Sequence, residues 1–419
     1  MVSPPPQVTT LAPQSQREPI LDVLRGFAIL GILLVNIHFM RGTQWMGAGD
    51  TGPSADSGTV QNLAQFLIGW LASGKFLSSL ALLFGIGAAL MRARAIAAGR
   101  SPRLLLLRRY VILTAFGLAH MLLLYPGDVL FVYGAAGLML LAFVNLRPRA
   151  LVVWAVALLS GYALAVVRLA GLYSYTPAAQ LAGESGAPAR DPFDDLRTEA
   201  IAAFTQGSYG DIVSVHAWQA LTLQAYQFSA LPWILALFVL GYALGRTGVL
   251  DALPAHRALW RRGACIGLIA GLPANIAVGY GGALGNFAGA AEPGASGLLT
   301  AATMGHAIGT PLLAVGYLCA LALYCLRRGP IRRLAAVGRM ALTAYLLQSA
   351  LALAIITAFQ FYDRLSSVSA LLLVAGVWAV LLVACPLWLR LFRLGPAEWL
   401  WRSLTYGRWQ PMRIGAGVQ

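Results

Sequence analysis

Residues 368–390 read VSALLLVAGVWAVLLVACPLWLR and contain no charged side chain before Arg390. A helix of this length rises a little more than ~30 Å, the thickness of the hydrocarbon core of a bilayer. Because lipid offers no hydrogen-bond partner to open backbone, such a stretch must cross as a helix. Further apolar stretches lie near 20–40, 70–91, 104–124, 127–145, 150–170, 228–245, 262–280, 300–326 and 340–360. The sequence therefore predicts an all-α, polytopic membrane bundle of about ten (roughly 10–11) transmembrane helices.

The composition indicates that the lipid bilayer is the main partner of the chain. Of the 419 residues, 59% are hydrophobic and only 11% are charged, and the mean hydropathy is +0.72. A soluble chain of this size needs more charge to cover its surface, so the excess apolar surface must face lipid. The net charge of +15 arises from 29 Arg and the single lysine Lys75, set against 15 acidic residues. The Arg residues lie in short tracts between apolar runs, which indicates membrane topology rather than a nucleic-acid partner.

The distribution of Arg predicts that both ends of the chain lie in the cytoplasm. With the N-terminus inside, every Arg-rich connection falls on the cytoplasmic side, as the positive-inside rule requires. These connections contain Arg92, Arg94, Arg100 and Arg103; Arg147 and Arg149; Arg246, Arg257 and Arg261; and Arg327, Arg328, Arg332, Arg333 and Arg339. Most of the acidic residues fall in the opposite loops. The predicted topology is N-in and C-in.

Three parts of the chain are expected. A disordered cytoplasmic tail at 1–18 precedes a single transmembrane bundle at 19–394, whose longest outside loop covers about 171–227. The segment around 61–73 is expected to form a separate re-entrant or interfacial helix, so that the next crossing starts near Lys75. The cytoplasmic amphipathic tail at 395–419 alternates aromatics with Arg, which favours an interfacial anchor over a role in closing a ligand mouth.

Glycine spacing indicates close helix packing. Three GxxxG patterns occur, at Gly241/Gly245, Gly267/Gly271 and Gly305/Gly309. Such patterns let two helix backbones approach closely. We favour packing within the bundle, and a homodimer is the alternative.

The first apolar run opens with LDVLRG at 21–26, which places Asp22 and Arg25 on one face near the cytoplasmic end. In one interpretation the two residues form an ion pair at the start of the helix. In the other, Arg25 and Arg17 bind an anionic ligand such as a CoA phosphate. Candidate residues for the same ligand are Lys75, Arg108 and Arg109.

Several protonatable side chains fall near the outer ends of the predicted helices. His38 and Asn36 end the first helix, His120 ends the third, and Asp128 follows shortly after it. His306 lies in the outer half of its helix. A carboxylate that holds a His fixes its tautomer and supports the imidazolium, which makes the His a general base. A single His in a bundle is usually a packing residue, whereas several at one depth indicate a site.

Two other kinds of site are less favoured by the residue pattern. No His-x-x-x-His, Glu-x-x-His or CxxC spacing is present, so no metal site is predicted. A proton-coupled carrier would use His and Asp relays as well. Carriers, however, usually bind near the midplane at broken helices, and the middle of the predicted bundle is nearly free of charge.

Six segments together resemble the YeiB-like membrane proteins, the family called domain of unknown function 418. They are LDVLRGFA at 21–28 running to VNI at 35–37, LFGIG at 83–87, GLAH at 117–120, GDVL at 127–130, GRMALTAY at 338–345 and GPAEWLWRSLTYG at 395–407. The resemblance covers most of the chain in order. It implies a multi-pass protein of a bacterial cytoplasmic (inner) membrane.

The LDVLRG opening is also similar to that of transmembrane acyltransferases, including the sugar O-acyltransferases and the lysosomal heparan glucosaminide acetyltransferase. This similarity implies that acyl-CoA binds from the cytoplasm near Arg25 and that an acceptor on the other side receives the acyl group. The position eleven residues beyond Arg25 is His in the sugar O-acyltransferases and Asn36 here. His38 lies two positions further, about 200° round the helix, so either His38 or His120 must act as the base.

The leading hypothesis is a membrane acyltransferase that uses acyl-CoA (acetyl-CoA) and acts on a small-molecule or glycan acceptor. His120 or His38 would be the base, Asp128 would orient the His, and Asn36 would donate a hydrogen bond to the reacting carbonyl. We prefer His120 with Asp128, because the short turn between them keeps both near one face. A small-solute transporter is the alternative, and a non-catalytic scaffold is the third hypothesis.

Overall fold

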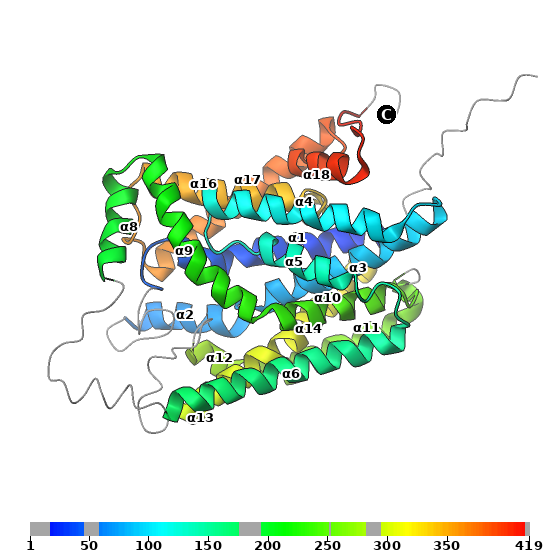
Figure 1. Ribbon diagram of the computed structural model, residues 1–419, viewed down its shortest axis with the longest axis horizontal. Coiled ribbons are helices and arrows are strands. Elements are labelled where there is room, and N and C mark those ends of the chain that lie inside the picture. Colours follow the sequence, from blue (N-terminus) through cyan, green and yellow to red (C-terminus); the bar gives the residue numbers. More distant parts are fainter. Residues whose placement is uncertain (1–16, 46–57, 176–193, 251–252, 282–294, 415–419) are drawn as a thin grey trace, which may run out of the picture.

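The computed structural model describes residues 17–45, 58–175, 194–250, 253–281 and 295–414 (Figure 1). Within these ranges the chain is helical, and the β pairing is limited to an isolated bridge between Phe392 and Arg413. The elements are α1 (Arg17–Met40), α2 (Thr59–Leu71), α3 (Lys75–Ala97), α4 (Pro102–Leu123), α5 (Leu130–Leu140), α6 (Pro148–Tyr175), α8 (Asp194–Gln206), α9 (Tyr209–Ser229), α10 (Leu231–Gly245), η1 (Leu253–His256), α11 (Arg257–Ala274), α12 (Ile276–Gly281), α13 (Ala295–Met304), η3 (Gly305–Gly309), α14 (Thr310–Arg328), α15 (Arg332–Arg339), α16 (Ala341–Ala358), α17 (Ser367–Leu391) and α18 (Pro396–Tyr406).

Many of these helices are long and apolar enough to cross a bilayer. In the part of the chain that the structure describes there are seven such spans, and the bent pair α9 and α10 makes an eighth if it counts as one. The seven are Pro19–Met40, Thr59–Ala97, Pro102–Leu123, Pro148–Arg168, Thr300–Arg328, Ala341–Ala358 and Ser367–Leu391. The shorter α5 is apolar too. This set of helices indicates a multi-pass membrane protein, as the sequence predicts.

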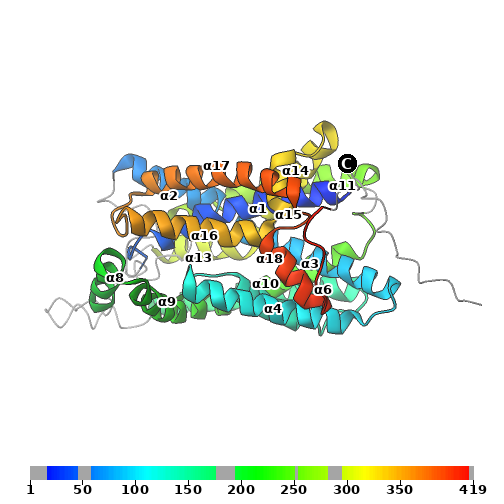
Figure 2. The same ribbon diagram turned by 90° about the horizontal axis from the view of Figure 1, so that it is seen from above.

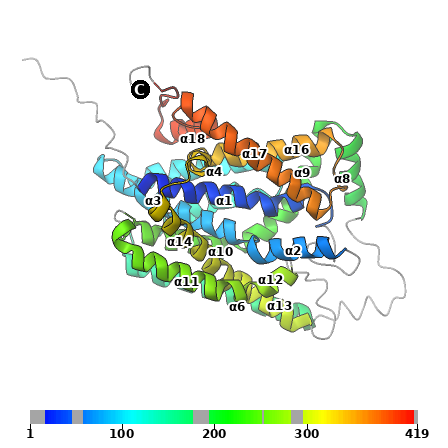
Figure 3. The ribbon, with the colours of Figure 1, turned by 180° about the vertical axis from the view of Figure 1, so that it is seen from behind.

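Most of the long helices run roughly along a common long axis, whereas α8 runs across it (Figures 1 and 2). The central helix α1 packs against α3, α14, α15, α16 and α17. On the side seen in Figure 3, α11 lies along α14. The start of α1 and the C-terminal helix α18 both lie toward the end of the molecule that is opposite α8 (Figure 1). The N-terminal tail expected at 1–18 lies outside the described residues, apart from the first turn of α1.

Close packing of α1 against α15 depends on two glycines. A Cβ atom at Gly26 would overlap the carbonyl oxygen of Leu334, and one at Gly338 would overlap the carbonyl oxygen of Asp22. Since both obstacles are backbone, neither can rotate away. The LDVLRG segment and the GRMALTAY segment therefore share one helix contact.

The three GxxxG pairs also lie at helix contacts within the chain. Gly241 faces the backbone of Leu82 in α3, and Gly267 faces Gly316 in α14. Gly305 and Gly309 both approach Ala274 at the end of α11. Packing within the bundle accounts for all three pairs.

The C-terminal helix α18 docks on the bundle beside α4 and α16. The Glu398 carboxylate accepts hydrogen bonds from the backbone N–H groups of Leu342 (2.5 Å) and Thr343 (2.9 Å) and from the Thr343 hydroxyl (2.5 Å). These N–H groups belong to the first turn of α16, where a helix has no acceptors of its own. Glu398 therefore caps α16, and the tail becomes part of the fold.

Candidate functional site

The structure brings His120 and Asp128 into direct contact. His120 lies in the last turn of α4, and Asp128 lies in the short connection to α5. Nδ1 of His120 is 2.8 Å from Oδ1 of Asp128, and both side chains are fully buried. Gly117 permits this approach, because a Cβ there would overlap the backbone of Phe131 and meet the Asp128 carboxylate. The pair predicted from the sequence is thus formed.

Further groups hold the Asp128 carboxylate. Tyr345 of α16 donates its hydroxyl to Oδ1 at 3.2 Å and accepts the Val129 N–H at 3.3 Å. The Phe131 N–H donates to Oδ2 at 2.7 Å. The rings of Tyr345 and His120 are 4.8 Å apart. Because the side chains of His120, Asp128 and Tyr345 are buried, these bonds fix the carboxylate and the imidazole in orientation.

The other ring nitrogen of His120, Nε2, is buried and has no hydrogen-bond partner among the residues that the structure describes. An Asp-held Nδ1–H leaves Nε2 as the atom with a free lone pair. Nε2 of His120 is therefore a basic nitrogen that can accept a proton, while Nδ1 and the Asp128 oxygens are hydrogen-bonded.

Amide side chains near this pair are also incompletely bonded. Gln224 of α9 donates to the carbonyl oxygens of Asp128 (2.9 Å) and Pro126 (3.2 Å), but its own Oε1 lacks a donor among the described residues. Gln348 lies one turn after Tyr345, is 0% exposed, and has neither amide atom paired within the described residues. Since buried polar groups are normally paired, such atoms indicate a place for a polar ligand or water.

Among the described residues, the two predicted residues at the end of α1 make no hydrogen bond to this network. Asn36 is buried, and its Nδ2 finds no acceptor among the described residues. His38 is partly exposed and lies close to Arg41. Within the described ranges no hydrogen bond joins His38 to His120 or Asp128. The imidazole that does approach His120 is His216 of α9, whose Nδ1 is 3.2 Å from the carbonyl oxygen of Leu122.

Three arginines gather at the opposite end of the bundle. Arg25 pairs with Asp22 at 2.9 Å, which is the ion pair expected from their spacing. Arg109 lies near both Arg25 and Arg402, and its guanidinium is stacked 3.7 Å from the centre of the Trp401 ring. Trp401 also donates its indole N–H to the Arg109 carbonyl at 3.0 Å. Grouped guanidinium groups repel one another and suit a polyanion, whose phosphates they bind well.

The remaining predicted cation sites are dispersed. Arg108 is exposed on α4. Arg17 starts α1, but its side chain lies outside the described residues. Lys75 lies at the start of α3, next to His306 rather than beside the arginines or His120.

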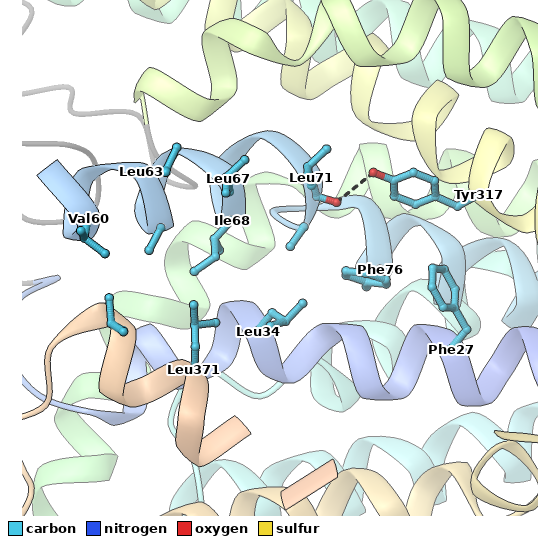
Figure 4. A pocket seen from close by; sticks show the side chains of 13 residues that line it. Phe27, Leu34, Val60, Leu63, Leu67, Ile68, Leu71, Phe76, Tyr317 and Leu371 are labelled. Carbon is cyan, nitrogen blue, oxygen red and sulfur yellow. Dashed lines mark hydrogen bonds between the residues drawn. The ribbon is translucent and has the colours of Figure 1, made fainter. Parts of the chain in front are cut away.

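A groove of about 530 Å³ lies between α1, α2, α14 and α17 (Figure 4). Its lining is apolar and includes Leu34, Leu67, Phe76 and Leu371. At one end of the groove the Tyr317 hydroxyl donates a hydrogen bond to the Leu71 carbonyl at 3.2 Å (Figure 4). None of the predicted site residues lines this groove. As for metals, no group of three or more His, Cys, Asp or Glu side chains that could hold an ion occurs in the described ranges.

Comparisons with known proteins give relatives over nearly the whole chain. The family described as "Protein of unknown function (DUF418)" matches residues 244–408. "Uncharacterized protein YxaH" of Bacillus subtilis (strain 168) is 29% identical, over 95% of this chain and 96% of its own length. "Uncharacterized protein YeiB" of Escherichia coli (strain K12) is 31% identical, over 93% of this chain and 96% of its own length. The chain belongs to the YeiB-like DUF418 family. No solved structure gives a significant match.

The segments that carry the YeiB-like resemblance meet one another in space. GLAH and GDVL supply His120 and Asp128, and GRMALTAY supplies Tyr345. The same GRMALTAY segment contacts LDVLRG through Gly338, and Glu398 of the C-terminal segment caps its helix. The short turn between α4 and α5 was the signal for the His–Asp pair. Tyr345 lies in the GRMALTAY segment, for which the sequence predicts no catalytic role, and His216 lies in the predicted outside loop.

Proposed function

We propose that this YeiB-like protein is an integral membrane acyltransferase that moves an acyl (acetyl) group from cytoplasmic acyl-CoA to an extracytoplasmic hydroxyl or amine. The observation that carries this proposal is the buried pair of His120 and Asp128, in which Nε2 has no partner within the described part of the chain. A His held in this way is suited to remove a proton from an acceptor. The acceptor is a small molecule or a glycan.

The proposed step is an acyl transfer. Nε2 of His120 takes the proton of the acceptor as the acceptor oxygen or nitrogen attacks the thioester carbonyl. The C–S bond then breaks, and the CoA thiolate leaves with the proton that the imidazolium returns. Asp128 supports the imidazolium meanwhile. Asn36, whose Nδ2 is free among the described residues, would donate to the carbonyl oxygen.

Acyl-CoA would bind at the arginine end. Arg25, Arg109 and Arg402 form the cationic group that suits its phosphates. Arg17 and Arg108 are additional candidates for binding these phosphates. No metal takes part in the proposed reaction.

The proposal assumes ten passes with both ends in the cytoplasm. The passes are α1, the pair α2 and α3, α4, α5, α6, the pair α9 and α10, the pair α11 and α12, the pair α13 and α14, α16 and α17. This count adds α5, α11 with α12, and the bent pair to the long apolar helices. It puts His120 and Asp128 near the outer face and the arginines near the inner one. The relatives come from bacteria, which supports the cytoplasmic membrane as the location.

Purified protein in nanodiscs with acetyl-CoA tests the proposal. Release of CoA thiol is measured across a panel of hydroxyl and amine acceptors, for the wild type, H120Q and the control H256Q at His256, which ends η1. We expect acceptor-dependent turnover that falls about 100-fold or more in H120Q and stays unchanged in H256Q. Absence of binding and turnover across the panel would exclude acyl transfer from CoA.

A small-solute transporter is the second candidate, and interrupted helices favour it. The connection between α2 and α3, the end of α11 and the η3 turn meet around Lys75 and His306, and carriers often bind at such breaks. Counterflow of a solute in proteoliposomes that is unaffected by acyl-CoA and by H120Q would select this candidate.

A further inference from the structure

Lys75 is the only lysine of the chain and is 0% exposed. It opens α3, and the neighbouring Phe76 packs against Phe27 near the middle of α1, with ring centres 5.2 Å apart. The amine therefore lies well inside the bundle. Burial of an ammonium group at this depth is costly and is normally compensated by a partner of opposite charge.

The protein gives Lys75 very little compensation. Its Nζ donates to the Gly69 carbonyl at 2.9 Å. An ammonium has three N–H groups, and this is the one acceptor that the described residues offer. No carboxylate in the described part of the chain forms an ion pair with it. Two N–H groups are therefore available to a further acceptor.

A second unpartnered group lies beside Lys75. His306 approaches Gly74, where a Cβ would lie 3.1 Å from the imidazole Cε1. Its Nδ1 is buried and has no hydrogen-bond partner among the described residues. Trp233 stacks on this ring at 5.2 Å and donates its indole N–H to the Ala307 carbonyl at 3.0 Å. The ring is thus held in place while one nitrogen stays open.

Several helix interruptions surround these two residues. Gly74 (φ +77°) separates α2 from α3, and α11 ends at Ala274, directly after Pro273. His306 itself lies in η3, a single π-helical turn, and π turns are frequent at functional sites. Thr310, just past η3, donates to the Asn275 side chain at 2.7 Å, so two of the interruptions touch. Such interrupted helices often form ligand sites in membrane bundles.

We propose that Lys75, His306 and the first turn of α3 bind an oxyanion, the carboxylate or phosphate group of a small solute. The ammonium keeps the Gly69 carbonyl and donates its other N–H groups to the anion, and His306 donates from Nδ1. The positive end of the α3 dipole points toward the same place. This site shares no residue with His120 and Asp128 and goes beyond the proposed acyl transfer.

The single lysine makes a direct test practical. Full-length protein with a lysine-free tag is labelled with [13Cε]lysine, so that its NMR spectrum contains one lysine signal, and is placed in nanodiscs of neutral lipid. Sodium acetate, sodium butyrate and sodium phosphate are added in separate titrations, with sodium chloride at matched ionic strength as the control. The carboxylate and phosphate arms distinguish the two sources of the anion.

We expect a saturable shift of the Lys75 signal with at least one oxyanion and not with chloride. In H306F, which keeps a ring against Trp233 but lacks Nδ1, binding should weaken about tenfold or more. H256Q should bind as the wild type does. Absence of a saturable shift with every oxyanion, or equal affinity in H306F and wild type, would overturn the proposal.

A second measurement separates binding from a structural role. K75M replaces the amine by an uncharged chain of similar length. Without ligand it should keep the wild-type Tm, and it should lose the rise in Tm that the oxyanion produces in the wild type. A large loss of Tm in K75M, together with no oxyanion effect on the wild type, would assign Lys75 to holding Gly69 and contradict the proposal.

Discussion

At the scale of single residues, the site depends on how completely Asp128 is bonded. Its two oxygens accept from His120, Tyr345 and the Phe131 backbone, and the contacts with the two side chains are fully buried. The His120 and Asp128 pair could be predicted, because eight positions and a short turn separate the two residues. Tyr345 is 217 positions from Asp128. No periodic signal in one sequence links residues so far apart.

Y345F should weaken both the fold and the proposed reaction. The change removes the hydroxyl that bonds Asp128 and leaves the Val129 N–H without an acceptor. We expect the free energy of unfolding to fall by about 1–2 kcal/mol. Tyr345 is a positioning residue, so kcat should fall while KM for acyl-CoA stays unchanged.

Y324F is the matched control for this change. Tyr324 is 51% exposed on α14 and should tolerate the loss of its hydroxyl. Thermal unfolding and steady-state rates of both variants provide the comparison. If Y345F and Y324F prove equal in both measurements, the hydroxyl of Tyr345 does not hold Asp128.

At the scale of elements, the apolar runs of the sequence correspond to helices, and the expected separate segment near 61–73 is α2. The interruptions are harder to anticipate. Pro273 near the end of α11 is visible in the sequence, but the π turn at η3 follows from packing against α11 and Trp233. The sequence predicts an outside loop where α9 lies and a crossing where α10 lies. In the structure the two helices follow each other with a bend between them.

G338A should disrupt the contact of α1 with α15. The added methyl group would overlap the Asp22 carbonyl, and the two helices must separate to admit it. We expect a loss of about 1–3 kcal/mol, or failure to fold. G376A adds the same methyl group on α17, where the space is open. Thermal unfolding of the two variants in nanodiscs should therefore differ clearly, and equal stability would contradict the described packing.

The Glu398 cap of α16 predicts a difference between two substitutions. E398Q keeps an oxygen that accepts the N–H groups of Leu342 and Thr343, whereas E398A loses the cap. E398A should therefore cost about 1 kcal/mol of stability at neutral pH, and E398Q much less. Thermal unfolding measures both variants. Equal losses would show that the cap contributes nothing.

The same carboxyl group predicts a pH dependence. Burial raises the pKa of Glu398 above its ordinary value of 4.5, although hydrogen bonds from Thr343 and Leu342 act in the opposite direction. The protonated form is thus favoured in the folded protein. The part of the stability that depends on this protonation is complete below the ordinary pKa of Glu398. It is lost as the pH rises through the raised pKa. The Tm of the wild type should fall over this range relative to E398Q, and parallel pH profiles would contradict the assignment.

At the scale of the whole molecule, hydropathy predicts the membrane helices and the distribution of charge predicts their orientation. The Arg pattern predicts a topology, and the structure brings the beginning of α1 and the helix α18 toward one end of the bundle. The placement of Lys75 could not be foreseen, because it depends on where α2 and α3 break relative to α1.

Reporter fusions test the proposed topology. Green fluorescent protein fused after α18 should fluoresce, and alkaline phosphatase fused after Gln206 should be active, since the two reporter proteins mature on opposite sides of the membrane. The reverse pair of results would exclude the N-in and C-in arrangement.

Transfer across a sealed membrane tests the central claim most directly. Proteoliposomes hold radiolabelled acetyl-CoA on the side of the arginine cluster, and an acceptor identified in the nanodisc screen is supplied only on the other side. The account predicts that the acceptor becomes acetylated on its own side, and that H120Q reduces this rate about 100-fold or more while H256Q does not. Acetylation that is equally fast in H120Q, or label that never reaches the acceptor in sealed vesicles, would contradict it.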